Sequence, residues 1–469
     1  LTRLRHSEHL ELRSENGKRL HYNSEFMEKN MQGERKTLTQ LSVPICLETL
    51  FYMLSGMVDT LMLSSVSDQA VGAVGTANTY IGVFIIMFGV ISSGMVAVMS
   101  QNIGAGRPGI AYQARQLGLV FNALTGILMS VVLAVFSGGI LRAVSIAPAL
   151  LESAETYLKI VGGASFLNAL IPIFSSYLRV FGYTKHSLIG TVVGNVINII
   201  LNSVFLFVFH WGVMGVATAT VISKVVNLII VAAMGAVLIK AKQSPERAQS
   251  RRILAQIVKI GFPSAFETAL YNVAMTFIVC FMNHMDTDGM NVTARSYAMQ
   301  IANFSYCVGA ALAQANAIMT GWRIGAKKYE ECDRGTRKAV IYGLVTATCF
   351  SVTFAITGRF IVHIFTNDIQ MIELVVKLLV VDIFLEFGRV TNLVYDQALK
   401  TSGDAIFPVI MGAIFMYLFA VGGTYFLGIH MGLLAVGAYI AMAGDECARA
   451  VGMVLRWKSG KWKSKSLVE

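Results

Sequence analysis

The chain has 469 residues, of which 55% are hydrophobic and only 14% are charged, and its formal net charge at pH 7 is +11. A soluble domain would have about 25% charged residues, whereas here apolar runs of about 20 residues recur along the whole sequence. The composition therefore excludes a soluble globular protein and indicates a helical protein that crosses a membrane many times. The six cysteines are scattered without a CxxC pair, so neither a metal site nor a disulfide framework is expected.

In chain order, residues 1–37 are polar and of mixed charge, and we expect them to form a cytosolic N-terminal tail. Twelve hydrophobic segments follow, each long enough to cross a bilayer as a helix. The predicted spans are 38–63, 70–102, 111–137, 150–177, 185–210, 213–240, 252–284, 291–322, 333–358, 370–398, 405–428 and 431–456. Residues 241–251 are expected to be a cytosolic linker, and residues 458–469 a basic cytosolic tail. The predicted fold class is an all-α polytopic membrane protein.

The basic residues are concentrated on one side of these spans. That side contains the N-terminal tail, the linker "KAKQSPERAQSRR", the loop residue Lys400 and the tail "RWKSGKWKSK", whereas the loops "SSVSDQ", "FHWG" and "GIHMG" contain none. Basic loops stay in the cytoplasm, so both termini are predicted to be cytoplasmic, in the cell membrane. The positive charge then reflects topology and attraction to anionic lipids, which argues against a nucleic-acid partner.

The two halves of the sequence resemble each other. "VPICLETLFYMLSG" (43–56) matches "FPSAFETALYNVAM" (262–275), "QNIGAG" (101–106) matches "WRIGAK" (322–327), and "HWGVMGVA" (210–217) matches "HMGLLAVG" (430–437). The offset between the matching segments stays at 219–221 residues. Six spans in each half give both halves the same orientation in the membrane. The sequence therefore predicts two parallel-repeat lobes, an N-lobe (38–240) and a C-lobe (252–457). This architecture is typical of transporters whose substrate site lies between the repeats.

Two carboxylates interrupt the first span. Glu48 and Asp59 are 11 residues apart, so on a helix they lie about 20° apart in angle and roughly 16 Å apart along the axis. A charged group at the bilayer centre costs about 2.5–3.5 kcal/mol or more, so such acids are functional candidates. Both are predicted to face one cleft, where burial favours reversible protonation or cation binding.

The fifth and sixth spans add polar groups to the first half. Asn198 and Asn202 are one helical turn apart, and Thr220 lies in the next span. Side chains of this kind often join helices to one another in membranes. They can also supply oxygen ligands to a cation, and with Asp59 in the same half we favour that second interpretation.

The second half has a different set of charges, and the position that matches Asp59 is apolar. Its candidate cleft or substrate residues are Glu267, Asp382, Glu386 and Arg389, with Glu386 and Arg389 spaced for a pair on one helix face. A further cluster in "GDECARAVG" (444–452) is expected to be a structural ion network.

These features together resemble the multidrug and toxic compound extrusion (MATE) transporters over residues 37–457. The motifs that carry the resemblance are "VDTLMLSSVSDQAVGAVG" (58–75), "QNIGAGR" (101–107), "GNVINIILN" (194–202), "GVMGVATATVIS" (212–223) and "LKTSGDAIFPV" (399–409). The resemblance implies two six-helix lobes around a cleft that opens alternately to each side. It also implies bulky organic substrates, often cationic, that are exchanged for H⁺ or Na⁺.

The resemblance assigns the coupling acid to Asp59 and a helix hinge to Pro44. It places the ion site at Asp59, Asn198, Asn202 and Thr220, with Na⁺ possible at Asp59, Asn198 and Thr220. Asn202 departs from the family pattern, because many members have aspartate there, and this favours H⁺ over Na⁺. Arg389 lies near the position at which one branch of the MATE family has an acidic residue in the C-lobe. A positive charge there argues against a second cation site in the C-lobe.

We therefore expect a cation-coupled antiporter that exports drug-like organic cations by alternating access, acts as a monomer and needs no cofactor beyond the coupling ion. One alternative is a flippase for lipid-linked oligosaccharide or another amphiphile, a group with a similar fold. A channel or receptor-like protein is a third interpretation. An enzyme is least expected, because the sequence has no nucleophile–base pair, Walker loop or zinc motif.

Overall fold

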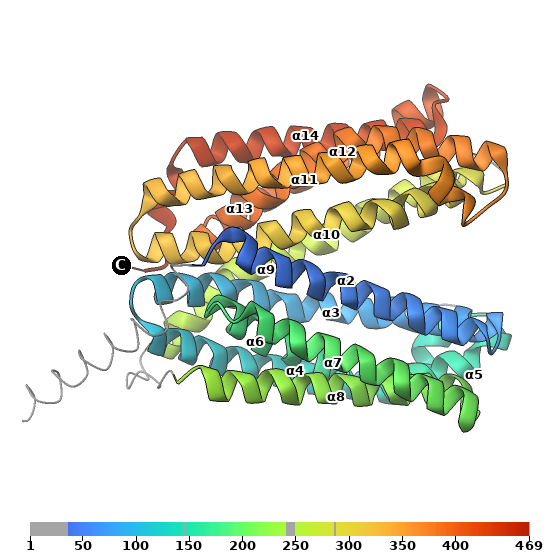
Figure 1. The fold of residues 1–469 in the computed structure, drawn as a ribbon, viewed down its shortest axis with the longest axis horizontal. Helices are drawn as coiled ribbons and strands as arrows, with labels where there is room; N and C mark the ends of the chain where they lie inside the picture. Colours follow the sequence, from blue (N-terminus) through green and yellow to red (C-terminus); the bar gives the residue numbers. More distant parts are fainter. Residues whose placement is uncertain (1–35, 144–145, 241–248, 286–287, 469) are drawn as a thin grey trace, which may run out of the picture.

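The computed structural model describes residues 36–143, 146–240, 249–285 and 288–468, which form helices and short connections and include no strand. The predicted N-terminal tail up to residue 35 and residues 241–248 of the predicted linker lie outside the described residues. The helices run side by side along the long axis of the molecule (Figure 1). The expectation of an all-α fold is confirmed.

Twelve helical segments of the described chain coincide with the twelve predicted spans. In the first half they are α2 (Leu38–Ser64), α3 (Asp68–Gly104), α4 (Pro108–Ala143), α5 to α6 (Pro148–Tyr157, Leu158–Gly162 and Phe166–Val180), α7 with η3 (Thr184–Ser203 and Val204–Val208) and α8 (Gly212–Leu238). In the second half they are α9 (Gln249–Asn283), α10 (Met290–Gly325), α11 (Tyr329–His363), α12 (Ile369–Ser402), α13 with η4 and η5 (Ile406–Phe415, Met416–Val421 and Thr424–His430) and α14 (Leu434–Lys458).

These segments differ in how apolar they are. Among the described residues, eight helices are long and apolar enough to cross a membrane, and α5 and α6 form a ninth candidate that bends by 42°. The three remaining long helices, α10, α12 and α14, are less apolar, and they contain many of the buried charges described below. The helices therefore include spans whose polar faces need partners inside the protein.

Local sequence explains where α2 begins and how it accommodates its proline. Thr37 caps the helix, because its side chain accepts a hydrogen bond from the Gln40 amide while the Gln40 side chain accepts one from the Thr37 amide. Pro44 lies inside the helix and has no N–H to donate to the Gln40 carbonyl. The Thr184 hydroxyl on α7 donates to that carbonyl instead, at 3.4 Å. The helix therefore tolerates the proline through a bond that a neighbouring helix supplies.

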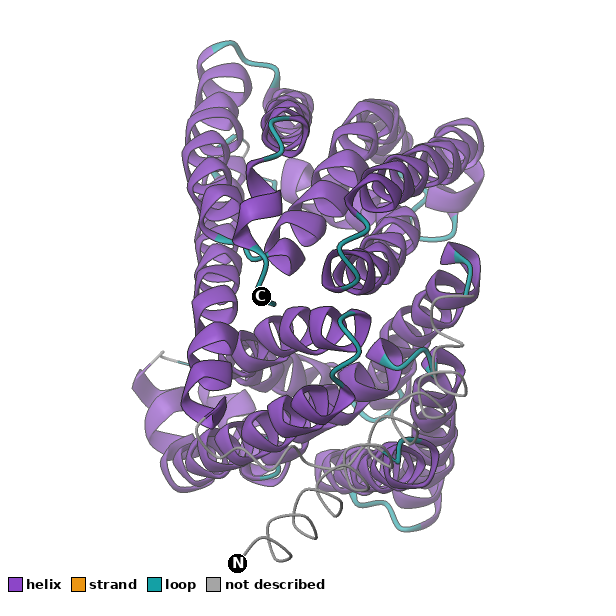
Figure 2. Ribbon diagram, turned by 90° about the vertical axis from the view of Figure 1, so that its left-hand side faces the viewer, coloured by secondary structure: helices purple, strands orange, loops and turns teal. Residues whose placement is uncertain are grey.

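The helices gather into two bundles, with α2 to α8 in one and α10 to α14 with α9 in the other (Figures 1 and 2). Each bundle has its own apolar core, and α3 packs against both α9 and α10 where the bundles meet. We call the first bundle the N-lobe and the second the C-lobe.

Glycines allow the lobes to pack backbone against backbone at one end. A Cβ atom on Gly104 of α3 would lie 2.0 Å from the Trp322 carbonyl oxygen of α10, and one on Gly325 of α10 would lie 1.9 Å from the Gln101 carbonyl oxygen of α3. Gly104 and Gly325 are 221 residues apart, so these contacts follow the sequence repeat. We call this contact the glycine gate.

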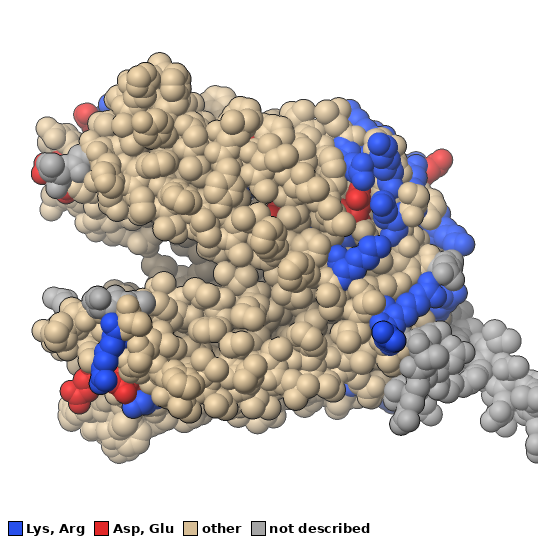
Figure 3. All heavy atoms as spheres, turned by 180° about the vertical axis from the view of Figure 1, so that it is seen from behind, with Lys and Arg blue, Asp and Glu red and all other residues tan. Residues whose placement is uncertain are grey.

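At the opposite end the lobes separate. Figure 3 shows a deep notch between them, and most of the Lys and Arg visible on this face lie at the other end. A cavity of about 540 Å³ lies between α2 and α10. Its lining includes Met57 and Thr60 of α2 and Asn303 and Phe304 of α10. The space between the lobes is thus closed by the glycine gate and accessible from the less basic end.

The C-terminal residues differ from the expected solvated tail. After α14 a short helix (Lys461–Lys465) places Trp462 against Trp457, with ring centroids 4.2 Å apart, and Trp462 is only 1% exposed. The Leu467 amide then donates to the Gln101 side-chain oxygen of α3 at 2.8 Å. This segment, 461–468, therefore connects the C-lobe to the N-lobe beside the glycine gate.

Candidate functional site

The N-lobe site centres on Asp59, which is half-buried where α2 meets α7. The Asn202 amide nitrogen donates to an Asp59 carboxylate oxygen at 2.6 Å and also lies 3.3 Å from the Asn198 side-chain oxygen. Both asparagines are buried, and the Asn202 side-chain oxygen has no hydrogen-bond partner among the described residues. The structure thus brings together three of the four residues predicted for the ion site.

The fourth predicted residue, Thr220, approaches the site through α8. Its hydroxyl donates to the Val216 carbonyl of its own helix at 2.8 Å, and its side chain also reaches the hydroxyl of Tyr157. One turn further along α8, the ammonium group of Lys224 acts electrostatically on Asp59. Lys224 was not among the predicted site residues, because a single lysine inside an apolar span has no local pattern that places it beside Asp59.

Glu48 faces α7 as Asp59 does, which confirms that the two acids share a helix face. Its carboxylate forms an ion pair with Arg179 at 2.7 Å and accepts from Ser187 at 3.0 Å and Thr191 at 3.3 Å. Arg179 also donates to Gln314 of the C-lobe at 3.0 Å. Glu48 was predicted to be a cleft residue, but its buried carboxylate is fully engaged in joining helices, so the structure supports a structural role.

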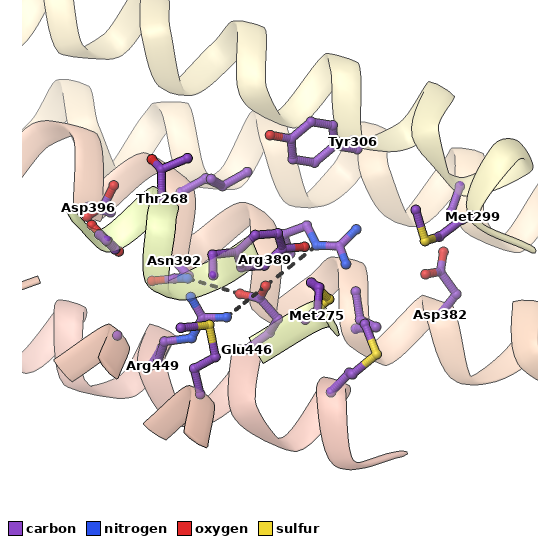
Figure 4. Close-up of a pocket in the computed structure, with 18 of the residues that line it drawn as sticks. Thr268, Met275, Met299, Tyr306, Asp382, Arg389, Asn392, Asp396, Glu446 and Arg449 are labelled. Atoms are coloured by element: carbon purple, nitrogen blue, oxygen red, sulfur yellow. Dashed lines mark hydrogen bonds and ion pairs between the residues drawn. The ribbon is translucent and has the colours of Figure 1, made fainter. Parts of the chain in front are cut away.

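The C-lobe contains a second cavity, of about 450 Å³, between α9, α10, α12 and α14. Three of the predicted cleft residues line it, namely Glu267, Asp382 and Arg389. Figure 4 shows Asp382 and Asp396 at opposite ends of this cavity, with Arg389, Glu446 and Arg449 between them. Asn303 lines both this cavity and the one between the lobes, so the two spaces are adjacent.

A connected ion network lies at the middle of the C-lobe cavity, and its members Arg389, Glu446 and Arg449 line the cavity. Arg389 lies 2.5 Å from Glu386 and 3.6 Å from Glu446, and Arg449 lies 2.9 Å from Glu446. Arg449 also bonds Asp445 at 2.6 Å. The predicted Glu386–Arg389 pair is therefore present, and the cluster expected in residues 444–452 joins it in one network.

Lys400 was assigned to a cytoplasmic loop, and the structure corrects this. The helix α12 extends to Ser402, and the Lys400 side chain is buried between Glu267, at 2.5 Å, and Asp396, at 2.7 Å. Glu267 is thus held in an ion pair inside the C-lobe. The spacing of Asp396 and Lys400, four residues apart, is the sequence signal that could have predicted this pair.

Two charged groups of this cavity form no ion pair with a described residue. Asp382 is 3% exposed and makes neither a hydrogen bond nor an ion pair with any described residue. Arg295 of α10 is 8% exposed, and its Nε atom has no hydrogen-bond partner among the described residues. Arg295 was not among the predicted residues, because a single arginine near the end of an apolar span has no local pattern that separates it from a loop residue.

Chemically, the two lobes offer different sites. The N-lobe presents one carboxylate with amide donors and a nearby lysine, which suits the uptake and release of a single small cation. The C-lobe presents a larger space with charges of both signs, tyrosines and methionines, which suits an organic molecule.

Comparisons with known proteins agree with this architecture. A family model described as MatE matches residues 44–204 and 263–426. The uncharacterized transporter YisQ of Bacillus subtilis is 32% identical, with 92% of this chain and 96% of YisQ covered. A probable multidrug resistance protein, NorM of Thermotoga maritima, is 26% identical, with 92% of this chain and 94% of NorM covered.

Solved structures show the same fold. An outward-facing structure of a multidrug resistance MATE transporter matches with a TM-score of 0.83 at 18% identity, covering 91% of this chain and 96% of the other. A transporter of the MOP superfamily from Pyrococcus furiosus, described as having a binding pocket of reverse polarity, matches with a TM-score of 0.82 at 19% identity, with the same coverage.

Proposed function

Because the chain belongs to the MATE family of membrane transporters, we propose that it is a cation-coupled antiporter that exports drug-like organic compounds from the cell. Relatives described as probable multidrug resistance proteins support the substrate class. The observation that carries the coupling proposal is Asp59, a half-buried membrane carboxylate held at 2.6 Å by Asn202 of α7. Its neighbours on α2, Met57 and Thr60, line the space between the lobes.

The orientation follows from the distribution of charge. The end of the molecule that carries most of the visible lysines and arginines is also the end at which the glycine gate is closed. If the basic end faces the cytoplasm, both termini are cytoplasmic and the cavity between the lobes opens outward. The proposed protein is a multi-pass protein of the cell membrane, surrounded by lipid and active as a monomer.

We favour H⁺ over Na⁺ as the coupling ion. Na⁺ binding needs several oxygen ligands and compensating negative charge. Here Asn202 presents its amide nitrogen to Asp59, Thr220 donates its proton within its own helix, and Lys224 supplies a positive charge nearby. Asp59 is thus balanced without a metal ion, and the set Asp59, Asn198 and Thr220 suits a proton better than Na⁺.

In the proposed cycle, Asp59 takes a proton from outside while the cleft is open to that side. Protonation weakens the contact with Asn202, and α2 rearranges near Pro44, where the helix lacks one internal hydrogen bond. The organic substrate leaves outward, the glycine gate opens, and the proton is released into the cytoplasm. No cofactor takes part.

The flippase alternative gains less support. Six carboxylates stand against four basic side chains in and around the C-lobe cavity. That excess of negative charge would repel the phosphates of a lipid-linked oligosaccharide.

The test is efflux of ethidium from proteoliposomes under separately imposed pH and Na⁺ gradients. We expect a pH gradient alone to drive transport by the wild type, and the Asp59→Asn variant to be folded but uncoupled. Asp368→Asn is the matched control, because Asp368 caps α12 at an exposed position and asparagine caps equally well. Transport that starts only when Na⁺ is added would refute proton coupling, and wild-type efflux by Asp59→Asn would refute the role of Asp59.

A further inference from the structure

The C-lobe cavity has two unpaired charges of opposite sign, whereas its other charged side chains are paired. Glu267, Asp396 and Lys400 form one ion-paired group, and Arg389, Glu446 and Arg449 belong to another. Asp382 and Arg295 remain, each more than nine-tenths buried and each lining the cavity. A buried charge without a partner is costly, so two of them facing one cavity indicate a ligand that supplies the missing partners.

Asp382 and Arg295 do not neutralise each other. Arg295 lies on α10, where its guanidinium reaches the Met275 sulfur at 3.8 Å, and no carboxylate of the described chain forms an ion pair with it. Asp382 lies on α12, and Figure 4 shows its carboxylate toward the Met299 end of the cavity. Glu386 and Arg389 of the ion network act on it electrostatically, but neither of them forms an ion pair or a hydrogen bond with it. Both side chains act electrostatically on the hydroxyl of Tyr439, which therefore lies in the neighbourhood of both.

The remaining lining describes the body of the ligand. Tyr271, Tyr306 and Tyr439 contribute aromatic surfaces, and Met275, Met299, Met416 and Met442 contribute flexible thioethers. Aromatic rings favour flat, conjugated molecules, and methionines adapt to irregular shapes. A volume of about 450 Å³ falls within the range of sites for drug-sized ligands.

We propose that this cavity binds aromatic zwitterions, with the anionic group of the ligand on Arg295 and its cationic group on Asp382. The proposal rests on the proposed export function and narrows its substrate class. Arg295 suits a carboxylate in particular, because a guanidinium can hold both carboxylate oxygens with parallel hydrogen bonds. Asn303, which lines both cavities, marks the route by which a ligand would pass to the space between the lobes.

The test compares two probes that differ in one charge. Tetramethylrhodamine is a zwitterion, and its methyl ester is a cation with the same aromatic core. Their equilibrium binding to the full-length protein in lipid nanodiscs is measured by fluorescence polarisation. We expect Arg295→Gln to weaken binding of the zwitterion at least tenfold and that of the ester less than twofold, and Asp382→Asn to weaken both. The matched control, Arg359→Gln, removes an exposed arginine of α11 and should change neither.

Thermal melting identifies variants that fail to fold. If Arg295→Gln does not fold, Arg295→Lys is used in its place. Lysine keeps the positive charge but cannot hold both carboxylate oxygens with parallel hydrogen bonds, so this variant should weaken binding of the zwitterion only. The proposal is overturned if the wild type does not bind tetramethylrhodamine, or if the Arg295 variants change both probes equally or neither. Binding needs no ion gradient. If Arg295→Gln weakens only zwitterion binding in a protein that shows no coupled efflux, the result supports this site and refutes the antiporter proposal. If Arg295→Gln changes both probes equally in a protein that shows coupled efflux, the result refutes this site and leaves the antiporter proposal standing.

Discussion

Replacing Lys400 by methionine tests whether the buried charges of the C-lobe depend on one another. The Lys400 ammonium lies 2.5 Å from Glu267 and 2.7 Å from Asp396, and all three side chains are largely shielded from solvent. Methionine has a similar length and removes only the charge. Breaking a buried ion pair by removing one partner costs about 3–5 kcal/mol, because the other charge stays buried without compensation.

This cost can be converted into an expected melting temperature. In domains of 150–250 residues, which is the size of the C-lobe, 1 kcal/mol shifts the melting temperature by about 2–4 °C. We therefore expect Lys400→Met to melt about 6–20 °C below the wild type. Melting is followed by tryptophan fluorescence of the purified protein in detergent.

Two further variants make the measurement specific. Lys338→Met removes an exposed lysine of α11 and should melt within about 1 °C of the wild type. The triple variant Lys400→Met, Glu267→Gln, Asp396→Asn removes all three charges and should recover most of the loss. Two results would contradict this reasoning: a melting temperature of Lys400→Met equal to that of Lys338→Met, or a triple variant that is no more stable than Lys400→Met. In either case Lys400, Glu267 and Asp396 do not form a coupled buried group.

The remaining predictions concern the glycine gate, the C-terminal segment and the coupling ion. Gly104→Ala should force the lobes apart at the gate, seen as longer spin-label distances between α3 and α10, whereas Gly139→Ala, with no atom within 4 Å of the added Cβ, should not. Deletion of residues 461–469 removes the contact with Gln101 and should also favour opening of the gate, so that unchanged distances would contradict the role of this segment. Asn202→Asp should strengthen the dependence of efflux on Na⁺, because it adds a second carboxylate next to Asp59, and efflux that stays independent of Na⁺ would contradict our account of this site.

The sequence was sufficient to predict the spans and the faces of individual helices. Hydrophobic segments of about 20 residues predicted all twelve helical segments, because only a helix satisfies its own backbone in lipid. The angular spacing of Glu48 and Asp59 correctly placed both on one face of the helix, but this face packs against α7 and the two acids do not share an open cleft. Pairs within one helix, such as Glu386 with Arg389, were also predictable, since residues three or four apart are neighbours on the surface of a helix.

Contacts between distant helices were not predictable in the same way. Glu48 pairs with Arg179, 131 residues further along the chain, and no spacing rule links them. Lys224 lies in the middle of a predicted span, and only packing against α2 reveals that it acts on Asp59. Lys400 was misplaced because the end of an apolar run was taken as the end of the helix, whereas α12 continues with its charges paired inside the protein.

In the proposed antiporter, the charges of the two lobes allow the coupling ion and the substrate to exclude each other without sharing a site. While Asp59 is ionised, it balances Lys224, and when Asp59 is protonated the N-lobe gains a net positive charge. At an effective dielectric constant of about 20, two unit charges about 15 Å apart interact by roughly 1 kcal/mol. A cationic substrate in the space between the lobes would therefore be bound less tightly when the proton is present, which is the condition for exchange. A zwitterion in the C-lobe cavity carries no net charge. The positive charge of the N-lobe attracts its anionic group and repels its cationic group, so only the difference between these two interaction energies acts on the ligand. Its release must then depend more on the movement of α10 and α12, which carry Arg295 and Asp382, than on the charge of Asp59.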